Sequence, residues 1–319
     1  MKMKKIDNSQ FIWAEKYRPQ CIDDMIISEE MRSKFLQFRK DGRFPHLLLS
    51  SVTPGIGKTS ITNAIIKELE ADTKWINCSQ DRGIDTFKYG VKDFVTSVSI
   101  DDSPKIVVGD EADGLTNDAQ KALRAIIEEY SKHSTFIFTC NYKEKLMEPL
   151  RNRFIQFDFD AMYTNHKKEI ALQVLERLKF ILENEGITYS LKDLSTIIQN
   201  FFPSIRKMIL ILQQCIVDGK LIIDENIIST NNKMQTIMDT IKNKNFSSTR
   251  KELNDINDPG ALYSYIFKHL DSHFTPASQP QAVLLTAKYQ DMHANARDKI
   301  ITAAAFAVEL MLTNGIEMI

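Results

Sequence analysis

The sequence lacks the patterns that mark disulfide-bonded, metal-binding and membrane-spanning proteins. Its four cysteines lie far apart and include no C-x-x-C pair, and its six histidines show no metal-ligand spacing. We therefore expect reduced cysteines that serve as small apolar residues, as is typical of intracellular proteins. No apolar run approaches the roughly 20 residues of a membrane span, and no apolar segment follows the charged start of the chain. A soluble, cytoplasmic protein without a membrane partner is expected.

A strong excess of charge of one sign is also absent. The chain has 41 Lys and Arg against 42 Asp and Glu, a formal net charge of −1. This balance excludes a uniformly basic nucleic-acid binder, but it leaves room for a local basic patch, especially one that partner subunits complete. With 319 residues the chain exceeds a typical single domain, so we expect about two or three compact units.

Five short apolar runs recur in the first half of the chain, at residues 46–50, 74–79, 105–110, 135–140 and 154–159. Most are continuous and not alternating, as is typical of strands that are buried on both faces. Helical patterns separate them, for example over residues 59–71 and 117–131. This alternation predicts an α/β fold with a parallel five-stranded sheet that helices cover on both sides.

Only helical patterns follow residue 159. A helix with apolar residues at helical spacing is expected over residues 166–185, with Gly186 as its C-cap. The polar stretch 229–233 is interpreted as a linker. We therefore divide the chain into an α/β domain at 1–160, a helical domain at 161–230 and a second helical domain at 231–319.

The stretch SSVTPGIGKTS, residues 50–60, fits the phosphate-loop pattern G-x-x-x-x-G-K-[ST] except at Val52, where the pattern has its first glycine. The remaining glycines let backbone N–H groups turn toward phosphate oxygens at the start of a helix. Lys58 would reach the β- and γ-phosphates, and the Thr59 hydroxyl would bind Mg²⁺. The alternative is a chance glycine-rich turn. The expected nucleotide-binding residues of this loop are Thr53, Pro54, Gly55, Ile56, Gly57, Lys58, Thr59 and Ser60.

A pair of carboxylates follows the run at residues 105–110. Asp110 would hold Mg²⁺ through water, and Glu111 would orient and deprotonate the attacking water. A salt-bridged surface pair is the alternative. Gly109 is unusual inside a strand, and we interpret it as a close approach of another backbone. Asp113 is expected to cap or pair locally.

Three further polar residues lie where they could reach a nucleotide. Asn141 directly follows the run at 135–140 and could position the water that attacks the phosphate. Arg153 precedes a strand, from which its guanidinium could stabilise phosphate charge in a neighbouring subunit. Arg206 lies near the first turn of a helix, within reach of a γ-phosphate. A surface arginine without a special role is the alternative for Arg153 and for the nearby Arg151.

Together these elements resemble the AAA+ ATPases, and other segments are similar to the sliding-clamp loaders of the replication factor C and phage clamp-loader family. The similar segments are WAEKYRP (13–19), DRGIDTFKYGVKDF (81–94), AQKALRAIIEEYS (119–131) and FPSIRKMI (202–209). The resemblance covers roughly residues 11–215 and implies ATP and Mg²⁺ as cofactors. It makes Asn141 and Arg206 the two nucleotide sensors, and it places Trp13, Tyr17, Arg18 and Pro19 on the adenine side. The implied catalytic residues are Lys58, Glu111, Asn141, Arg153 and Arg206, with Thr59 and Asp110 on the metal.

The resemblance also implies a function. A clamp loader is a DNA-stimulated ATPase that opens a ring-shaped sliding clamp and loads it on primer–template DNA. Its subunits, copies of one chain with a different small subunit, form a pentameric ring held together by a helical collar domain. The length and three-part layout are most similar to the subunits of T-even-type bacteriophages, which act in the host cytoplasm. Two departures stand out: the Ser-Arg-Cys motif of the family reads Asn152-Arg153-Phe154 here, and no zinc-binding cysteine cluster interrupts the first domain.

Candidate DNA contacts are Arg82, Lys88 and Lys121. Arg82 lies where a helix is expected to begin at Ile84, and a helix start beside an arginine can bind a phosphate without reading the base. Solvated helix charges are the alternative for each of the three residues. We assign the clamp-binding surface to an apolar helix end formed by Phe94, Val95 and Val98, although these residues could equally be core.

Two other functions are considered. KYGV at 88–91 resembles the aromatic–glycine pore loop of protein unfoldases, but the apolar residues around it keep helical register. A non-hydrolysing scaffold subunit predicts the loss of Lys58, Glu111 or Arg153, and all three are present.

Overall fold

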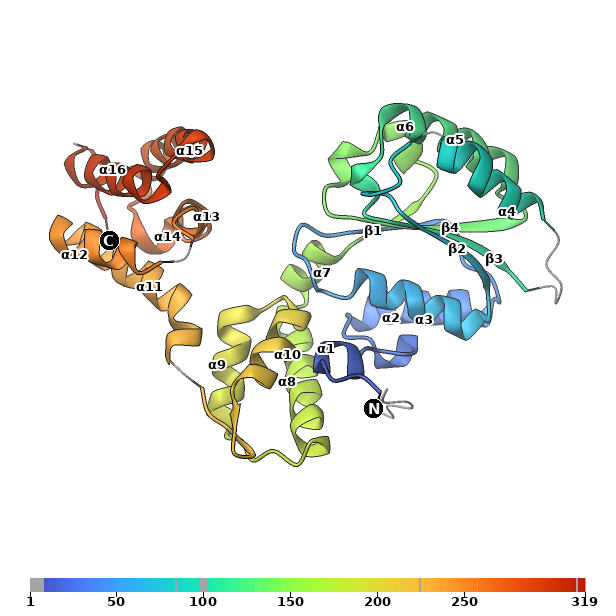
Figure 1. Ribbon diagram of the computed structural model, residues 1–319, viewed down its shortest axis with the longest axis horizontal. Helices are drawn as coiled ribbons and strands as arrows, with labels where there is room; N and C mark the ends of the chain where they lie inside the picture. Colours follow the sequence, from blue (N-terminus) through green and yellow to red (C-terminus); the bar gives the residue numbers. More distant parts are fainter. Residues whose placement is uncertain are drawn as a thin grey trace. The chain divides into compact units, whose positions relative to one another are not determined.

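The computed structural model describes residues 9–83, 85–97, 103–223, 225–256, 258–313 and 315–318 (Figure 1). The chain forms two compact units, Met1–Ile222 and Ile223–Ile319, which are described separately. No helix among the described residues has the length and apolar character to cross a bilayer.

The first unit contains a parallel five-stranded sheet with strand order β2-β3-β4-β1-β5, which confirms the predicted α/β fold. The strands are β1 (Leu47–Ser50), β2 (Asp72–Asn77), β3 (Lys105–Asp110), β4 (Ser134–Cys140) and β5 (Ile155–Asp158). The three central strands are buried along almost their whole length, as continuous apolar runs predict. The edge strand β2 is mostly exposed and half of the residues of β5 are exposed, so the expected burial on both faces is wrong for them.

Gly109 lies in the middle of this sheet, and the expectation that another backbone approaches it is wrong. A Cβ atom at this position would lie 2.8 Å from Cζ of Phe138, on the neighbouring strand β4. The aromatic ring of Phe138 occupies the space, and glycine is the residue that leaves it free.

Helices cover both faces of the sheet (Figure 1). Helices α2 (Glu29–Lys40) and α3 (Lys58–Leu69) lie on one face. On the other lie α4 (Lys92–Thr96), α5 (Asn117–Tyr130) and α6 (Glu148–Arg151). The Thr116 hydroxyl caps α5 by accepting a hydrogen bond from the N–H of Ala119. Its apolar residues recur every three or four positions, so one side of the helix is buried in the core.

The segment assigned to clamp contact lies partly in the core. The predicted start at Ile84 lies outside the described residues, and a π-helix spans Thr86–Val91 ahead of α4. Val95 is buried in the core cluster that includes residues of α5 and the central strands, and Phe94 packs against that cluster. The assignment to a clamp-binding surface is therefore wrong for Val95. Phe94 is partly exposed and its assignment stays a prediction, and Val98 lies outside the described part of the chain.

Helices complete the first unit. The short α1 (Trp13–Lys16) precedes the sheet, and α7 (Phe159–Asn165) leaves β5 and leads into the later helices. These are α8 (Lys167–Asn184), α9 (Leu191–Phe201) and α10 (Ile205–Gln214), followed by the hairpin β6 (Ile216–Val217) and β7 (Lys220–Leu221). Gly186 follows the end of α8 with φ +68°, as the predicted cap requires.

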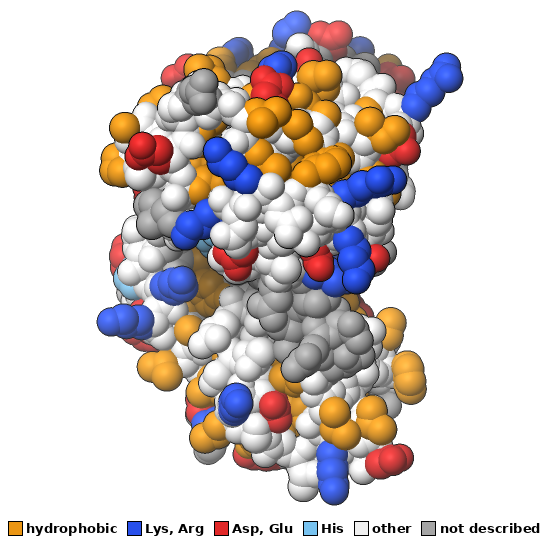
Figure 2. All heavy atoms as spheres, turned by 90° about the vertical axis from the view of Figure 1, so that its left-hand side faces the viewer, with side chains coloured by type: hydrophobic (Ala, Val, Ile, Leu, Met, Phe, Trp, Pro, Cys, Tyr) orange, Lys and Arg blue, Asp and Glu red, His pale blue; other side chains and the backbone are white. Residues whose placement is uncertain are grey.

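The second unit is helical, as predicted. Its helices are α11 (Glu225–Lys242), α12 (Phe246–Asn254), α13 (Ala261–Lys268), α14 (Leu270–His273), α15 (Gln279–Asn295) and α16 (Lys299–Leu312). The linker expected at 229–233 is wrong, because these residues continue α11. Apolar side chains gather at the top of the view in Figure 2, over this unit. Its exposed large apolar residues include Phe246, Phe267, Leu284, Met292, Ile301 and Leu312.

Candidate nucleotide-binding site

The phosphate loop joins β1 to α3 and contains two residues in the left-handed conformation. Gly55 has φ +75° and Gly57 has φ +109°, values that favour glycine. Val52 does not have a positive φ. Its side chain is exposed, and its N–H donates a hydrogen bond to Oδ2 of Asp160 at 2.7 Å. Valine therefore fits where the sequence pattern has its first glycine.

Three successive carbonyl groups of the loop accept hydrogen bonds from other parts of the chain. The donors are the Ser204 hydroxyl to Pro54 at 3.0 Å, the Arg206 N–H to Gly55 at 3.0 Å and the Tyr163 hydroxyl to Ile56 at 3.2 Å. The N–H groups at the start of α3, which have no helical acceptor, remain for an anion. The loop is thus ordered by the rest of the unit before any phosphate binds.

The start of α10 lies directly on this loop. A Cβ atom at Gly55 would come within 2.9 Å of Cβ of Arg206 and 3.0 Å of Oγ of Ser204. Glycine is therefore required at position 55 for two reasons: the positive φ of its backbone and the close approach of α10.

Lys58 is buried at the first position of α3, and its ammonium group is held by two oxygen atoms. Nζ donates to the carbonyl oxygen of Ser51 and to Oδ1 of Asn141, both at 2.9 Å. Burial lowers the pKa of Lys58, and neighbouring carboxylates, among them Asp160, oppose this shift. Asn141 follows β4, which lies between β1 and β3, so it occupies the predicted place between the strand ends.

Oxygen ligands suited to Mg²⁺ meet at the end of β3. The Thr59 hydroxyl lies 3.3 Å from Oδ1 of Asp110, and the Thr139 hydroxyl donates to the same oxygen. Hydroxyl and carboxylate oxygens are the ligands that Mg²⁺ prefers, so these residues fit the predicted ion. Asp113 accepts a hydrogen bond from the N–H of Asn141 at 3.1 Å, a local pairing of the kind predicted.

Glu111 follows Asp110 in a strained backbone conformation. Its φ is +57°, in the left-handed region, and its side chain is exposed. Its N–H donates to Oγ1 of Thr139 at 3.2 Å, which ties it to the end of β4. Left-handed non-glycine residues of this kind are concentrated at functional sites.

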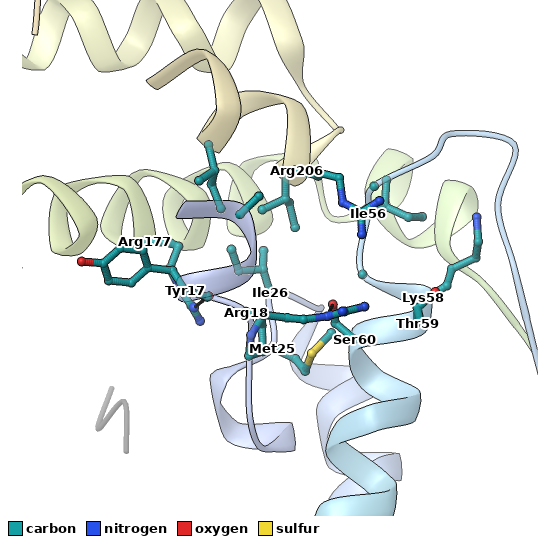
Figure 3. Close-up of a pocket in the computed structure, with 16 residues that line it drawn as sticks. Tyr17, Arg18, Met25, Ile26, Ile56, Lys58, Thr59, Ser60, Arg177 and Arg206 are labelled. Atoms are coloured by element: carbon teal, nitrogen blue, oxygen red, sulfur yellow. Dashed lines mark hydrogen bonds between the residues drawn. The ribbon is translucent and has the colours of Figure 1, made fainter. Parts of the chain in front are cut away.

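A pocket opens between the phosphate loop, the N-terminal segment and α10 (Figure 3). The predicted residues in its wall are Tyr17, Arg18, Pro19, those at 55–60 and Arg206. Apolar side chains complete the wall and suit the faces of a base: Met25, Ile26, Ile205 and Ile209. Trp13, Thr53 and Pro54 are outside the wall. Trp13 is buried, and its backbone N–H donates to Oε1 of Gln213 at 2.9 Å.

Glu15 lies between two arginines of this pocket and was not predicted from the sequence. Its carboxylate is 3.1 Å from Nη1 of Arg18 and 3.7 Å from Nη2 of Arg206. Arg18 also donates from Nε to the Ser60 hydroxyl at 3.3 Å. The sequence did contain a signal for this residue, because Glu15 is the one acidic residue of the segment WAEKYRP.

Arg177 of α8 is a second residue that the sequence reasoning missed. It is buried, and burial lowers its pKa to about 10. Its guanidinium donates to the carbonyl oxygen of Tyr17 at 3.2 Å and to that of Asp24, so it joins α8 to the N-terminal segment. The available signal was a charged residue beside Val174 and Leu178, on the buried side of α8.

Arg153 lies away from the pocket. Its side chain is half exposed and forms an ion pair with Glu128 of α5. Its neighbour Arg151 is less exposed, at the end of α6. An exposed guanidinium with one carboxylate partner can be drawn to a stronger anion on another molecule.

The candidate DNA contacts are also outside the pocket, and all three side chains are exposed. The carbonyl oxygen of Arg82 accepts from the Thr116 hydroxyl at 3.2 Å, which places Arg82 beside the start of α5. Lys121 lies one turn further along α5 and pairs with Asp118 at 3.1 Å. Lys88 lies on the π-helix, 5.7 Å above the Tyr89 ring.

Comparisons with known proteins agree with this geometry. Residues 48–161 match the model of the ATPase family associated with various cellular activities (AAA). The replication factor C small subunit of Sulfurisphaera tokodaii is 38% identical over 221 residues, which cover 67% of this chain and 65% of that protein. The replication factor C small subunit 2 of Pyrobaculum aerophilum is 35% identical over 223 residues, which cover 68% of this chain and 67% of that protein. The match thus spans slightly less than two thirds of the first relative's length.

A solved structure shares the fold. The Thermotoga maritima RuvB Holliday junction branch migration motor superposes with a TM-score of 0.54 and covers 82% of this chain and 94% of its own. Its sequence identity is 17%, so this likeness concerns the fold alone.

Proposed function

The chain belongs to the family of replication factor C small subunits within the AAA ATPases, and from this premise we propose that it is an ATPase subunit of a DNA polymerase clamp loader. The main observation behind the proposal is the contact of Lys58 with Asn141 beside Thr59 and Asp110. It brings together the phosphate loop, the residue proposed to sense the nucleotide and the proposed metal ligands. The lid and collar of this proposal are the helices α8–α10 and α11–α16.

In this proposal the base of ATP lies against the N-terminal segment and α10, and the phosphates lie on the loop. Lys58 is buried, so its charge acts on the β- and γ-phosphates with less screening than it would in water. Asn141 orients the attacking water and Glu111 accepts its proton. Arg206 breaks its ion pair with Glu15 and binds the γ-phosphate. Thr59 and Asp110 would hold Mg²⁺, which would neutralise phosphate charge.

Assembly completes each site. Arg153 exchanges its partner Glu128 for the γ-phosphate of a neighbouring subunit. Exposed apolar side chains of the second unit join copies of the chain and a different small subunit in a pentameric ring. Arg82, Lys88 and Lys121 follow the phosphates of primer–template DNA, and the ring opens a sliding clamp. We place this loader in the cytoplasm and, for a T-even-type phage protein, in that of the host.

The first test is the substitution Glu111→Gln. We expect ATP affinity within about threefold of the wild type and turnover reduced by roughly 10²–10⁴-fold, the usual loss of a general base. A matched control is Glu70→Gln, since Glu70 is exposed and also has a positive φ, 49°, but lies at the far end of α3. Undiminished phosphate release by Glu111→Gln would remove Glu111 from its role.

The second test concerns what stimulates the ATPase. Phosphate release is measured with primer–template DNA and a sliding clamp, and separately with an unfolded protein. Stimulation by DNA and clamp is expected. Stimulation by the unfolded protein alone would instead support the unfoldase reading of residues 88–91.

A further inference from the structure

We propose that Asp160 is a positioning residue of the ATP site, which fixes the entrance to the phosphate loop and, through it, the ammonium group of Lys58. The inference rests on the proposed function in that it takes ATP as the ligand of the loop. Asp160 lies in the first turn of α7, about a hundred positions from the loop in sequence.

Both oxygen atoms of the Asp160 carboxylate contact the loop. Oδ2 accepts from the N–H of Val52 at 2.7 Å, and Oδ1 accepts from the Ser51 hydroxyl at 2.8 Å. Bonds to an ionised acceptor are shorter and stronger than bonds between neutral groups. One carboxylate therefore holds two successive residues at the point where β1 ends.

The Ser51 hydroxyl extends this control to a third residue. The hydroxyl has one proton, and the carboxylate is both the closer and the stronger acceptor, so the proton is donated to Asp160. The oxygen of that hydroxyl then accepts from the N–H of Thr53 at 3.0 Å. The turn at residues 51–53, where the family pattern has its first glycine, is thus built around a side chain from α7.

This turn also carries a carbonyl group that holds Lys58. Nζ of Lys58 donates to the carbonyl oxygen of Ser51 at 2.9 Å. If Asp160 were lost, the Ser51 peptide could rotate and the ammonium group would lose one of its two fixed acceptors. The negative charge of Asp160 also favours the charged form of the buried Lys58.

Asp160 is not required to cap its own helix. The cap of α7 is Asp158, which accepts from the N–H of Ala161 at 3.1 Å and pairs with Lys143 at 2.7 Å. Among the ion pairs of the described residues, Asp160 takes part in none. The contacts of its carboxylate are thus directed to the loop.

The experiment is a double-mutant cycle between Asp160 and Lys58 in the full chain. The dissociation constant is measured for an ATP analogue with a fluorescent group on the ribose, for the wild type, Asp160→Ala, Lys58→Ala and the double variant. We expect Asp160→Ala to weaken binding roughly tenfold in the wild type. In the Lys58→Ala background we expect less than about a twofold effect, because the residue through which Asp160 acts is gone.

Two further variants separate positioning from folding. Asp160→Asn keeps the side-chain volume and one acceptor, and it should weaken binding by less than Asp160→Ala. Asp158→Asn, the matched control, should lower the melting temperature without changing the dissociation constant.

Equal losses of affinity from Asp160→Ala in both backgrounds, or no loss in either, would overturn the inference and leave the proposed function standing. Failure of the folded wild-type chain to bind the analogue would overturn both.

Discussion

Gly109 offers a quantitative test of the packing around strand β3, because the change Gly109→Ala adds a single methyl group to a filled space. Its Cβ would lie 2.8–3.0 Å from three ring atoms of Phe138, where ordinary contacts are 3.4–4 Å. The ring must therefore move by several tenths of an ångström. It is fully buried, and the ring of Phe154 lies 5.3 Å away between centroids.

Overpacking of this kind destabilises a core by about 1–3 kcal/mol, and we expect Gly109→Ala to lower the free energy of unfolding by that amount. The assay is urea denaturation followed by tryptophan fluorescence. In a Trp13→Phe background, Trp75 is the one remaining tryptophan. Trp75 lies in β2 opposite Val108, the neighbour of Gly109, so its signal reports on this part of the sheet.

The cause is tested by a second change at the same contact. In a Phe138→Leu background the obstructing ring atoms are gone, so Gly109→Ala should change stability by less than about 0.5 kcal/mol. Gly90→Ala is the control, because nothing lies within 4 Å of a Cβ at Gly90, and it should stabilise the chain by up to about 1 kcal/mol. Equal destabilisation by Gly109→Ala with and without the Phe138 ring would refute the steric argument.

Two other predictions concern assembly and pH. Arg153→Ala should leave ATP binding by the single chain unchanged but reduce phosphate release by the assembled loader about 10³-fold or more; an equal loss in the isolated chain would contradict a role in the neighbouring site. His46 stays neutral to a lower pH in the fold than in the unfolded chain, since burial lowers its pKa and Nδ1 accepts from the N–H of Phe136 at 3.2 Å. The unfolded chain takes up a proton first as pH falls below 6.5, so stability should decrease there. His46→Asn should remove this part of the pH dependence in urea denaturation curves, and an unchanged curve would contradict the assignment.

The placement of the candidate site could be predicted from the sequence because each motif is local and its place in an α/β sheet is fixed by the strand before it. As expected, Lys58 of α3 contacts Asn141 after β4, and Thr59 of the same helix contacts Asp110 at the end of β3. Asp160 could not be predicted in this way, because its contact with the loop depends on how α7 packs after β5.

Errors in the fold have physical causes as well. The run containing Trp75 has the residues of a buried strand, but β2 lies at the sheet edge and this tryptophan is 40% exposed. Residues 229–233 are polar and poor helix formers, yet α11 continues through them. Met234, Ile237 and Met238 of the same helix are buried in the core of the second unit, and tertiary packing of this kind outweighs local propensity.

The hydrogen bonds to the carbonyl groups of Pro54, Gly55 and Ile56 determine when the loop loses its conformational freedom. Fixing one residue of a mobile loop opposes binding by about 1–2 kcal/mol. Here that loss accompanies folding of the domain, long before a nucleotide arrives. Capture of ATP should therefore resemble docking onto a rigid receptor, with an association rate governed by diffusion and charge and not by rearrangement of the loop.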